Sequence, residues 1–451
     1  MSRRTRLTVL LLVSTLPVMT GAVLSPALPA LKSAFGGSAS AQTWARWVLT
    51  TPALFVAAGA PLAGLLIDWK GRRPVLLASM LLFGASGSVG GLLGALPAIT
   101  VSRAALGLAA GGIGTAATTL IVDYFDEAQS QILGGQAAVM ALAAMAYTIL
   151  GGALTDLSWR APFGAFALAL VLTGPAFYLL PEPEPSSTAD GPPDDASETA
   201  PMPWGRIGLL YGLAFLGLAV FNLIRVELPY YLRDLGLTSG LRIGAVLSAG
   251  TVTGALASFG YDRARARVGA WGTLAVAFGL FAAGFGVIAR AISPGVVLGG
   301  LLLAGGGMGL FVPSLTDGVG ETVPENVRGR ALGGLSTLRN LGRFAAPLLT
   351  RPALVGPSAA APFLGGTVLA SILASGLLLW TLVQYVQDHS ATAPEHSPLS
   401  ENIAEPPCGQ RWRLRKLCSL KITGLRVEPQ ASSGGSPEDL LSDTTRSIRC
   451  R

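Results

Sequence analysis

The sequence predicts an all-α polytopic membrane protein in which twelve transmembrane helices form two pseudo-symmetric bundles of six. Hydrophobic residues make up 51% of the 451 residues and charged residues only 13%, a composition too apolar for a soluble multidomain protein. Twelve runs approach the roughly 20 apolar residues that a helix needs to cross a bilayer. A polar linker separates the first six runs from the last six.

Each run is expected to be a helix, because the bilayer core offers no water to unpaired backbone groups. Four segments follow from this pattern: an N-terminal bundle over 1–181, a linker over 182–206, a C-terminal bundle over 207–388 and a tail over 389–451. The predicted spans, in order, are 7–30, 43–67, 74–96, 99–122, 131–154, 161–181, 207–231, 241–261, 270–290, 294–316, 331–353 and 361–386.

The linker and the tail are polar. Residues 182–206 are rich in proline, acids and small polar residues, a composition typical of a disordered segment. The tail is also expected to be disordered. Its basic stretch around Trp412 fits either a solvated chain or a short amphipathic helix on anionic lipid.

Basic residues at the start of the chain predict its orientation. Arg3, Arg4 and Arg6 place the N-terminus in the cytoplasm by the positive-inside tendency, and an even number of spans returns the C-terminus to the same side. The protein is therefore expected to be a multi-pass plasma-membrane protein. Four arginines near the predicted outer face weaken this bias, namely Arg160, Arg233, Arg242 and Arg290.

The composition of the spans disfavours several kinds of site. All three cysteines and both histidines lie outside the twelve spans, so neither a thiolate metal site nor a bound cofactor is expected there. The spans also contain no nucleophile–base pair or paired carboxylates, which disfavours an enzyme. The net charge of +7 is assigned to loops beside anionic lipid rather than to nucleic-acid binding.

A dense group of charges lies between the second and third spans, in the stretch GLLIDWKGRRP. Glycines there suit close packing and a sharp reversal of the chain. This stretch resembles the signature G-x-L-x-D-x-x-G-[RK]-[RK] of the major facilitator superfamily, with Trp69 where an arginine often follows the aspartate. The resemblance covers residues 7–388, and the matching residues are Gly64, Leu66, Asp68, Gly71, Arg72 and Arg73.

The resemblance implies a conformational latch at this turn. Asp68 would cap the N-terminus of helix 11 around Arg330 to Gly333, and Arg72 would pair with Asp123 at the end of helix 4. These contacts would close the cytoplasmic side and break as the two halves rock, which gives alternating access.

Two shorter matches concern coupling and packing. Arg103 and Gly107 match an R-x-x-x-G element that the family associates with proton coupling, with Leu106 in place of its usual glutamine. Gly151 and Gly152 match the end of the antiporter signature G-P-x-x-G-G and are expected to pack helix 5. The first two residues of that signature are Tyr147 and Thr148 here.

Charged residues inside the spans indicate where a substrate would bind. Tyr211, Asn222 and Arg225 lie on one stripe of the seventh span, and Arg339 and Arg343 share a face of the eleventh. In the resembled fold both helices face the central cavity, so its wall would be electropositive and suited to a solute with a negative group. The alternative is that these arginines bind backbone carbonyls and helix ends to stabilise packing.

A carboxylate is also needed if protons drive transport. Glu227 is the only acid well inside an apolar span, and it lies near the outer boundary. It is therefore a candidate proton carrier, with Asp123, Asp68 and the bound substrate as alternatives.

The predicted function is that of a secondary active transporter. It would move a small amphipathic organic solute across the plasma membrane by alternating access, as proton-coupled efflux. The expected partners are the solute, protons and membrane lipid, and the protein is expected to be a monomer. The alternatives are an importer or facilitator of organic anions and a transporter-like sensor that signals through its tail.

Overall fold

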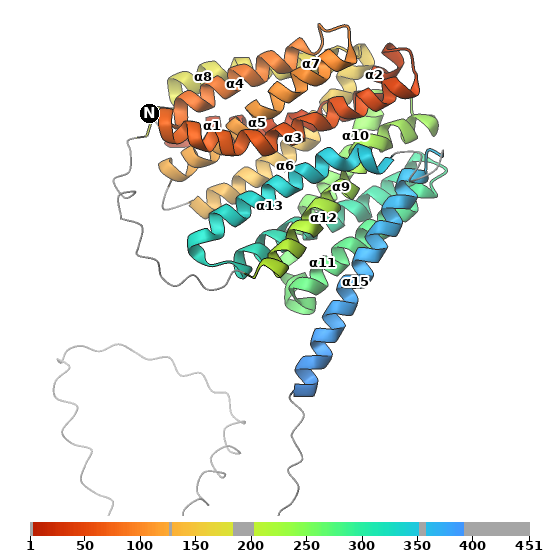
Figure 1. Cartoon of the computed structure of the whole chain (residues 1–451). Helices are drawn as coiled ribbons and strands as arrows, with labels where there is room; N and C mark the ends of the chain where they lie inside the picture. Colours follow the sequence, from red (N-terminus) through yellow and green to blue (C-terminus); the bar gives the residue numbers. More distant parts are fainter. Residues whose placement is uncertain (1–2, 126–128, 184–202, 351–357, 392–451) are drawn as a thin grey trace, which may run out of the picture. The chain divides into compact units, whose positions relative to one another are not determined.

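The described part of the computed structural model, residues 3–125, 129–183, 203–350 and 358–391, contains helices and no strands. Much of the predicted linker (184–202) and nearly all of the tail (392–451) lie outside it. We call the elements before the linker the first half and those after it the second half. In Figure 1 the first half runs from red to pale orange and the second from green to blue.

The first half begins with a broken helix. Pro26 and Pro29 interrupt the predicted first span, because proline cannot donate a backbone hydrogen bond, and a short 3-10 turn joins the two pieces. The elements are α1 (Arg3–Ala22), η1 (Ser25–Ala27), α2 (Leu28–Ala34), α3 (Ala39–Lys70), α4 (Arg72–Val89), α5 (Leu96–Tyr124), α6 (Gln129–Leu157), α7 (Ala161–Gly164), η3 (Ala165–Ala167) and α8 (Leu168–Leu179).

The second half begins with an unbroken helix, α9. The eleventh predicted span begins six residues early, at Glu325, because Pro324 ends the preceding extended stretch and starts the helix. The elements are α9 (Trp204–Asp234), α10 (Gly240–Ser258), α11 (Tyr261–Ala289), α12 (Pro294–Thr322), α13 (Glu325–Ala345), η5 (Ala346–Thr350) and α15 (Ala361–Ala391).

Twelve helical segments of the described residues account for the twelve predicted spans. Ten are long and apolar enough to cross a membrane, with α1 and α2 counted together and α7, η3 and α8 counted together. The other two are α4 and α13. The arginines at the start of α4 lower its hydropathy, and α13 carries four arginines and a glutamate.

The most extensive helix contacts between the halves are those of α6 with α10 and of α3 with α13. Between α6 and α10 the backbones approach so closely that a Cβ on Gly152 would meet the carbonyl oxygen of Gly240. Gly151 faces the backbone of Val23, just after α1, in the same way. Small residues thus let α6 pack against both its own half and the other half.

The same reversal of the chain occurs once in each half. Gly71 (φ 90°) separates α3 from α4, and Gly269 (φ 74°) interrupts α11, both in a backbone region that favours glycine. Gly71 comes three residues after Asp68, whereas Gly269 comes seven residues after Asp262. The repeat predicted from Asp68 and Asp262 is therefore present in the backbone, but more residues separate the aspartate from the glycine in the second half.

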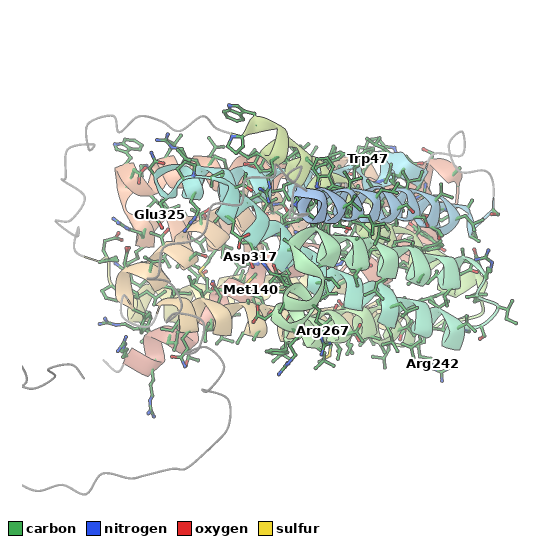
Figure 2. The ribbon with its side chains drawn as sticks, turned by 90° about the horizontal axis from the view of Figure 1, so that it is seen from below. Trp47, Met140, Arg242, Arg267, Asp317 and Glu325 are labelled. Carbon is green, nitrogen blue, oxygen red and sulfur yellow. The ribbon has the colours of Figure 1, made fainter. Side chains whose placement is uncertain are left out.

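Because successive spans are antiparallel, the turns fall at two ends of the bundle. We call the end that holds the α3–α4, α10–α11 and α12–α13 turns the Asp68 end. The end that holds the α6–α7 and α9–α10 turns is the Glu227 end. Figure 2 shows Glu325, at the start of α13, and Arg242, at the start of α10, toward opposite ends.

Candidate functional site

A cavity of about 780 Å³ lies between the two halves. We call it the central cavity. Its wall comes from α1, α3 and α5, with Met140 of α6, in the first half, and from α9 and α13 in the second. The described residues that line it include two arginines, Arg225 and Arg343, and no aspartate, glutamate or lysine.

Two asparagines hold Arg343 of α13 in place. Asn222 of α9 donates from Nδ2 to the carbonyl oxygen of Arg343 (2.9 Å), and Asn340 Oδ1 accepts from Arg343 Nη1 (3.2 Å). Asn222 and Asn340 also line the central cavity. Asn340 thus orients the charged group of Arg343, and Asn222 holds its backbone. Both side chains are neutral and leave the positive charge uncompensated.

Arg225, Arg339 and Arg343 take part in none of the ion pairs among the described residues. Their guanidinium groups also donate to no backbone carbonyl in this part of the chain. Arg339 is partly buried, its Nε has no hydrogen-bond partner, and its charge acts on Arg343 together with that of Arg225. A substrate-binding role for these arginines stays a prediction.

Two residues predicted for the cavity wall lie outside it. The Tyr211 hydroxyl donates to the carbonyl oxygen of Ala331 (2.7 Å) and so joins α9 to α13. Arg339 is on the helix face beside the lining residues Ser336 and Asn340 rather than among them. Helical spacing along α9 and α13 grouped these residues with others that do line the cavity. It could not show how each side chain packs against its neighbours.

The turn between α3 and α4 is held by contacts within the first half. Arg72 Nε lies 3.0 Å from Asp123 Oδ2, so this pair connects α4 with the end of α5. Arg73 Nη2 donates to the carbonyl oxygen of Phe177 in α8 (2.6 Å). Gly64 lies in the last turns of α3 with open space around it.

Asp68 does not cap α13 in this structure. Its side chain is exposed and has no hydrogen bond or ion pair with any described residue. The predicted target, Arg330 to Gly333, is the second turn of a helix that begins at Glu325, where backbone N–H groups already bond within the helix. The predicted contact between Asp68 and α13 is therefore absent from this conformation. A latch role for the turn stays a prediction.

A different acid, Glu182, caps the neighbouring helix α4. Its carboxylate accepts from the backbone N–H of Arg72 (2.6 Å) and of Arg73 (2.9 Å), which are free groups of the first helical turn. The sequence indicated only that Glu182 begins the linker. The available signal was that Gly71, just before α4, has no side chain with which to cap it.

The R-x-x-x-G element lies away from the central cavity. Arg103 is fully buried, donates from Nη2 to the carbonyl oxygen of Gly87 (2.9 Å), and stacks over Phe163 and Phe166 at 4.9 and 4.6 Å. Gly107 packs against the backbone of Pro52. Arg103 contacts no acid among the described residues, so its role in proton coupling stays a prediction.

Glu227 forms a buried ion pair that the sequence did not reveal. Its carboxylate, in α9, lies 2.7 Å from Arg46 Nε and accepts from Arg46 Nη2 at 2.8 Å. Only 5% of Glu227 is exposed. Arg46 belongs to α3, so the pair crosses between the halves. The signal available beforehand was a lone arginine and a lone acid, each in an apolar span.

A second crossing contact lies at the same end. The carboxylate of Asp156, at the end of α6, accepts from the backbone N–H of Gly240 (2.6 Å) and Leu241 (3.0 Å) and from the Ser239 hydroxyl (2.9 Å). An acid of the first half therefore caps helix α10 of the second. This residue also escaped the sequence-based prediction.

The second half has its own counterpart of the Arg72–Asp123 pair. Arg265 Nη1 lies 2.8 Å from Asp317 in α12, and Tyr261 donates to the same carboxylate at 2.9 Å. Asp262, which the sequence matched with Asp68, is exposed and has no partner among the described residues. The repeated feature is thus the arginine–aspartate pair near the turn.

The chain matches a family model described as Major Facilitator Superfamily over residues 10–347. It is 30% identical over 319 residues to a class G tetracycline resistance protein of Vibrio anguillarum, covering 67% of this chain and 78% of that protein. It is 28% identical over 134 residues to multidrug resistance protein 3 of Bacillus subtilis, covering 28% of this chain and 26% of that protein.

Solved structures share the fold. A D-xylose–proton symporter superimposes with a TM-score of 0.66 at 17% identity, covering 82% of this chain and 96% of that one. The human organic anion transporter MFSD10 superimposes with a TM-score of 0.58 at 22% identity, covering 83% of this chain and 100% of that one.

Proposed function

Because this chain belongs to the major facilitator superfamily and is a multi-pass membrane transporter, we propose that it moves a small amphipathic organic anion by alternating access. The observation that carries the proposal is the central cavity, which presents Arg225 and Arg343 with no acid among its described lining residues. An arginine in a partly dehydrated cavity keeps its charge and needs an anion or water beside it. A substrate carboxylate supplies that partner.

The size and the remaining wall of the cavity support an amphipathic substrate. A volume of about 780 Å³ falls within the usual range of small-molecule sites. Its α3 and α5 walls carry no charged side chain and consist mostly of alanine, glycine and threonine, whereas the arginines and asparagines come from α9 and α13. We infer that the apolar body of the solute faces the first half and its negative group the second.

We further propose proton-coupled efflux across the plasma membrane, with both chain termini in the cytoplasm. The tetracycline and multidrug resistance relatives support the outward direction, and Arg3, Arg4 and Arg6 support the orientation. Glu227 is the proposed proton carrier, because it is a buried acid between the halves. We also propose that the protein acts as a monomer in membrane lipid.

A matched pair of probes tests the substrate class. We expect 2-naphthoate, and not neutral 2-naphthamide, to protect the purified protein against thermal unfolding. The Arg343→Gln variant should need at least about tenfold more 2-naphthoate, which corresponds to about 1.4 kcal/mol for one lost charge-assisted contact. Arg267→Gln is the matched control, because Arg267, labelled in Figure 2, is exposed and is not among the residues that line the central cavity. Equal protection by both probes would refute an anionic substrate.

Transport direction needs a separate measurement. In proteoliposomes that contain a pH-sensitive dye, we expect 2-naphthoate movement to carry protons in the opposite direction and to be driven by an imposed pH gradient. Import together with protons would instead favour the alternative, an importer of organic anions. Movement that is independent of the gradient would favour a facilitator.

A further inference from the structure

A second cavity lies next to the central one at the Glu227 end. Its volume is about 590 Å³, and we call it the Glu227 cavity. It is formed by α2 and α3 of the first half and by α9, η5 and the start of α15 of the second. Apart from Glu227, the proposed proton carrier, the residues that line this space have no role in the proposed function.

The Arg46–Glu227 ion pair lies where the two cavities meet. On α3, Arg46 lines the Glu227 cavity, whereas Thr50, one turn further along, lines the central cavity. On α9, Glu227 lines the Glu227 cavity and Arg225, two residues earlier, lines the central cavity. Both helices therefore pass from one cavity to the other at this pair, which forms the partition between them.

The polar groups of the Glu227 cavity are suited to a negative ligand. Three basic side chains line it, against two acids, and Glu227 is already paired with Arg46. Lys32 Nζ donates to Gln42 Oε1 (2.8 Å) and lies 5.8 Å from the centre of the Tyr230 ring, so most of its donor capacity remains free. The basic residues are Lys32, Arg46 and Arg233, and the acids are Glu227 and Asp234.

Tyr230 provides an independent indication of a ligand. Its side chain lines the Glu227 cavity, only 9% of the residue is exposed, and its buried hydroxyl has no hydrogen-bond partner. An unpaired buried hydroxyl costs about 1–3 kcal/mol, so such groups normally have a partner. A carboxylate in this cavity would accept from both the Tyr230 hydroxyl and Lys32.

We propose that the Glu227 cavity is a second binding station for an organic carboxylate, and that the Arg46–Glu227 pair is the gate between the two stations. This inference rests on the proposed function, because it takes the substrate to be an anion. The substrate carboxylate replaces Glu227 on Arg46 as it passes the partition. Lys32, whose charge acts on Glu227, receives the displaced carboxylate. During the exchange the substrate carboxylate is thus paired with Arg46 and the Glu227 carboxylate with Lys32.

The experiment uses single cysteines as reporters of occupancy. Cys408, Cys418 and Cys450 lie in the tail, outside the described residues, and are first replaced by serine. One variant then carries Thr43→Cys in the Glu227 cavity, and its matched control carries Thr118→Cys in the central cavity; both threonines are exposed lining residues. The rate of alkylation by N-ethylmaleimide is measured with 2-naphthoate or with 2-naphthamide.

We expect 2-naphthoate to slow alkylation at both reporters by at least threefold and 2-naphthamide to leave both rates unchanged. Tyr230→Phe or Lys32→Gln should abolish protection at Thr43→Cys and preserve it at Thr118→Cys. Protection at Thr118→Cys alone would overturn the second station and leave the proposed function intact. Protection at Thr43→Cys alone would support the station and contradict the proposed central site. Protection at neither reporter would overturn both.

The gate is tested with Glu227→Gln, which releases Arg46. We expect half-maximal protection of Thr43→Cys at a 2-naphthoate concentration at least threefold lower than in the parent. Asp234→Asn removes the same charge from an exposed residue of the same cavity that has no ion pair among the described residues. An equal gain in both variants would overturn the gate and indicate a general effect of charge. Glu227→Asp, which keeps the charge and shortens the side chain, provides a second variant if the glutamine variant does not fold.

Discussion

The two ends of the bundle use charged residues differently. At the Asp68 end, Arg72–Asp123 and Glu182–α4 connect helices of the first half, and Arg265–Asp317 connects helices of the second. At the Glu227 end, Arg46–Glu227 and Asp156–α10 each connect one half to the other. A third crossing hydrogen bond, from the Ser25 hydroxyl to the carbonyl oxygen of Arg225 (2.7 Å), lies beside the central cavity. None of the hydrogen bonds or ion pairs between halves among the described residues lies at the Asp68 end.

This difference shows which movement the contacts oppose. Interactions within a half keep its helices together while that half moves as a body. Interactions between halves hold one conformation and must break when the halves rock. The structure is therefore fastened at the Glu227 end, while the Asp68 end carries charges that are free to form contacts in another conformation.

The largest expected effect follows from breaking the buried crossing pair. Arg46→Gln leaves Glu227 buried without its partner, and we expect the free energy of unfolding to fall by about 3–5 kcal/mol. Thermal unfolding in detergent measures this loss. Arg46→Gln combined with Glu227→Gln should recover most of it, because no unpaired charge remains. A double variant as unstable as the single one would show that the side chains matter through packing.

The second crossing contact should have a smaller effect. Asp156→Ala removes the cap of α10, and we expect this conformation to lose about 1 kcal/mol of stability, the typical value for a helix cap. Alkylation of Thr43→Cys should rise and that of Thr118→Cys should fall. Asp262→Asn is the control, because this exposed acid has no partner among the described residues. Unchanged rates would mean that the cap does not hold the halves together.

The pair within the first half provides the contrast. Arg72→Gln breaks a partly exposed ion pair, so we expect at most about 1 kcal/mol of lost stability. Because the pair does not cross between halves, the two reporter cysteines should keep their relative rates of alkylation. A shift as large as that of Asp156→Ala would remove the distinction between the two ends.

Asp68→Asn should have the smallest effect on stability. The side chain is exposed and unpaired with any described residue, so unfolding should be unchanged. We nevertheless expect slower 2-naphthoate transport in proteoliposomes, since the proposed latch forms in the conformation that is closed at this end. Full transport by a correctly inserted variant would refute the latch.

The helices and the second-half wall of the central cavity could be predicted largely from local pattern. Long apolar runs gave all twelve segments, and helical spacing brought Asn222, Arg225 and Arg343 to one cavity. One charge-bearing element was harder to place. The start of α13 was missed because its first two turns are polar, and this error moved the expected target of Asp68.

The missed contacts join residues that are distant in the chain. Arg46 and Glu227 are 181 positions apart, and Asp156 and Gly240 are 84 apart. No periodicity connects such residues, and their pairing depends on how the two halves pack. Tyr230 was missed for a different reason. An unpaired hydroxyl becomes apparent only when all of its neighbours are known.

The capping of α4 by Glu182 has a mechanical consequence. Glu182 follows α8, and its carboxylate accepts from the backbone N–H groups of Arg72 and Arg73. The chain just after α8 is therefore bonded directly to the start of α4. A variant without this carboxylate would leave both N–H groups without their partner and loosen the turn that carries Asp68.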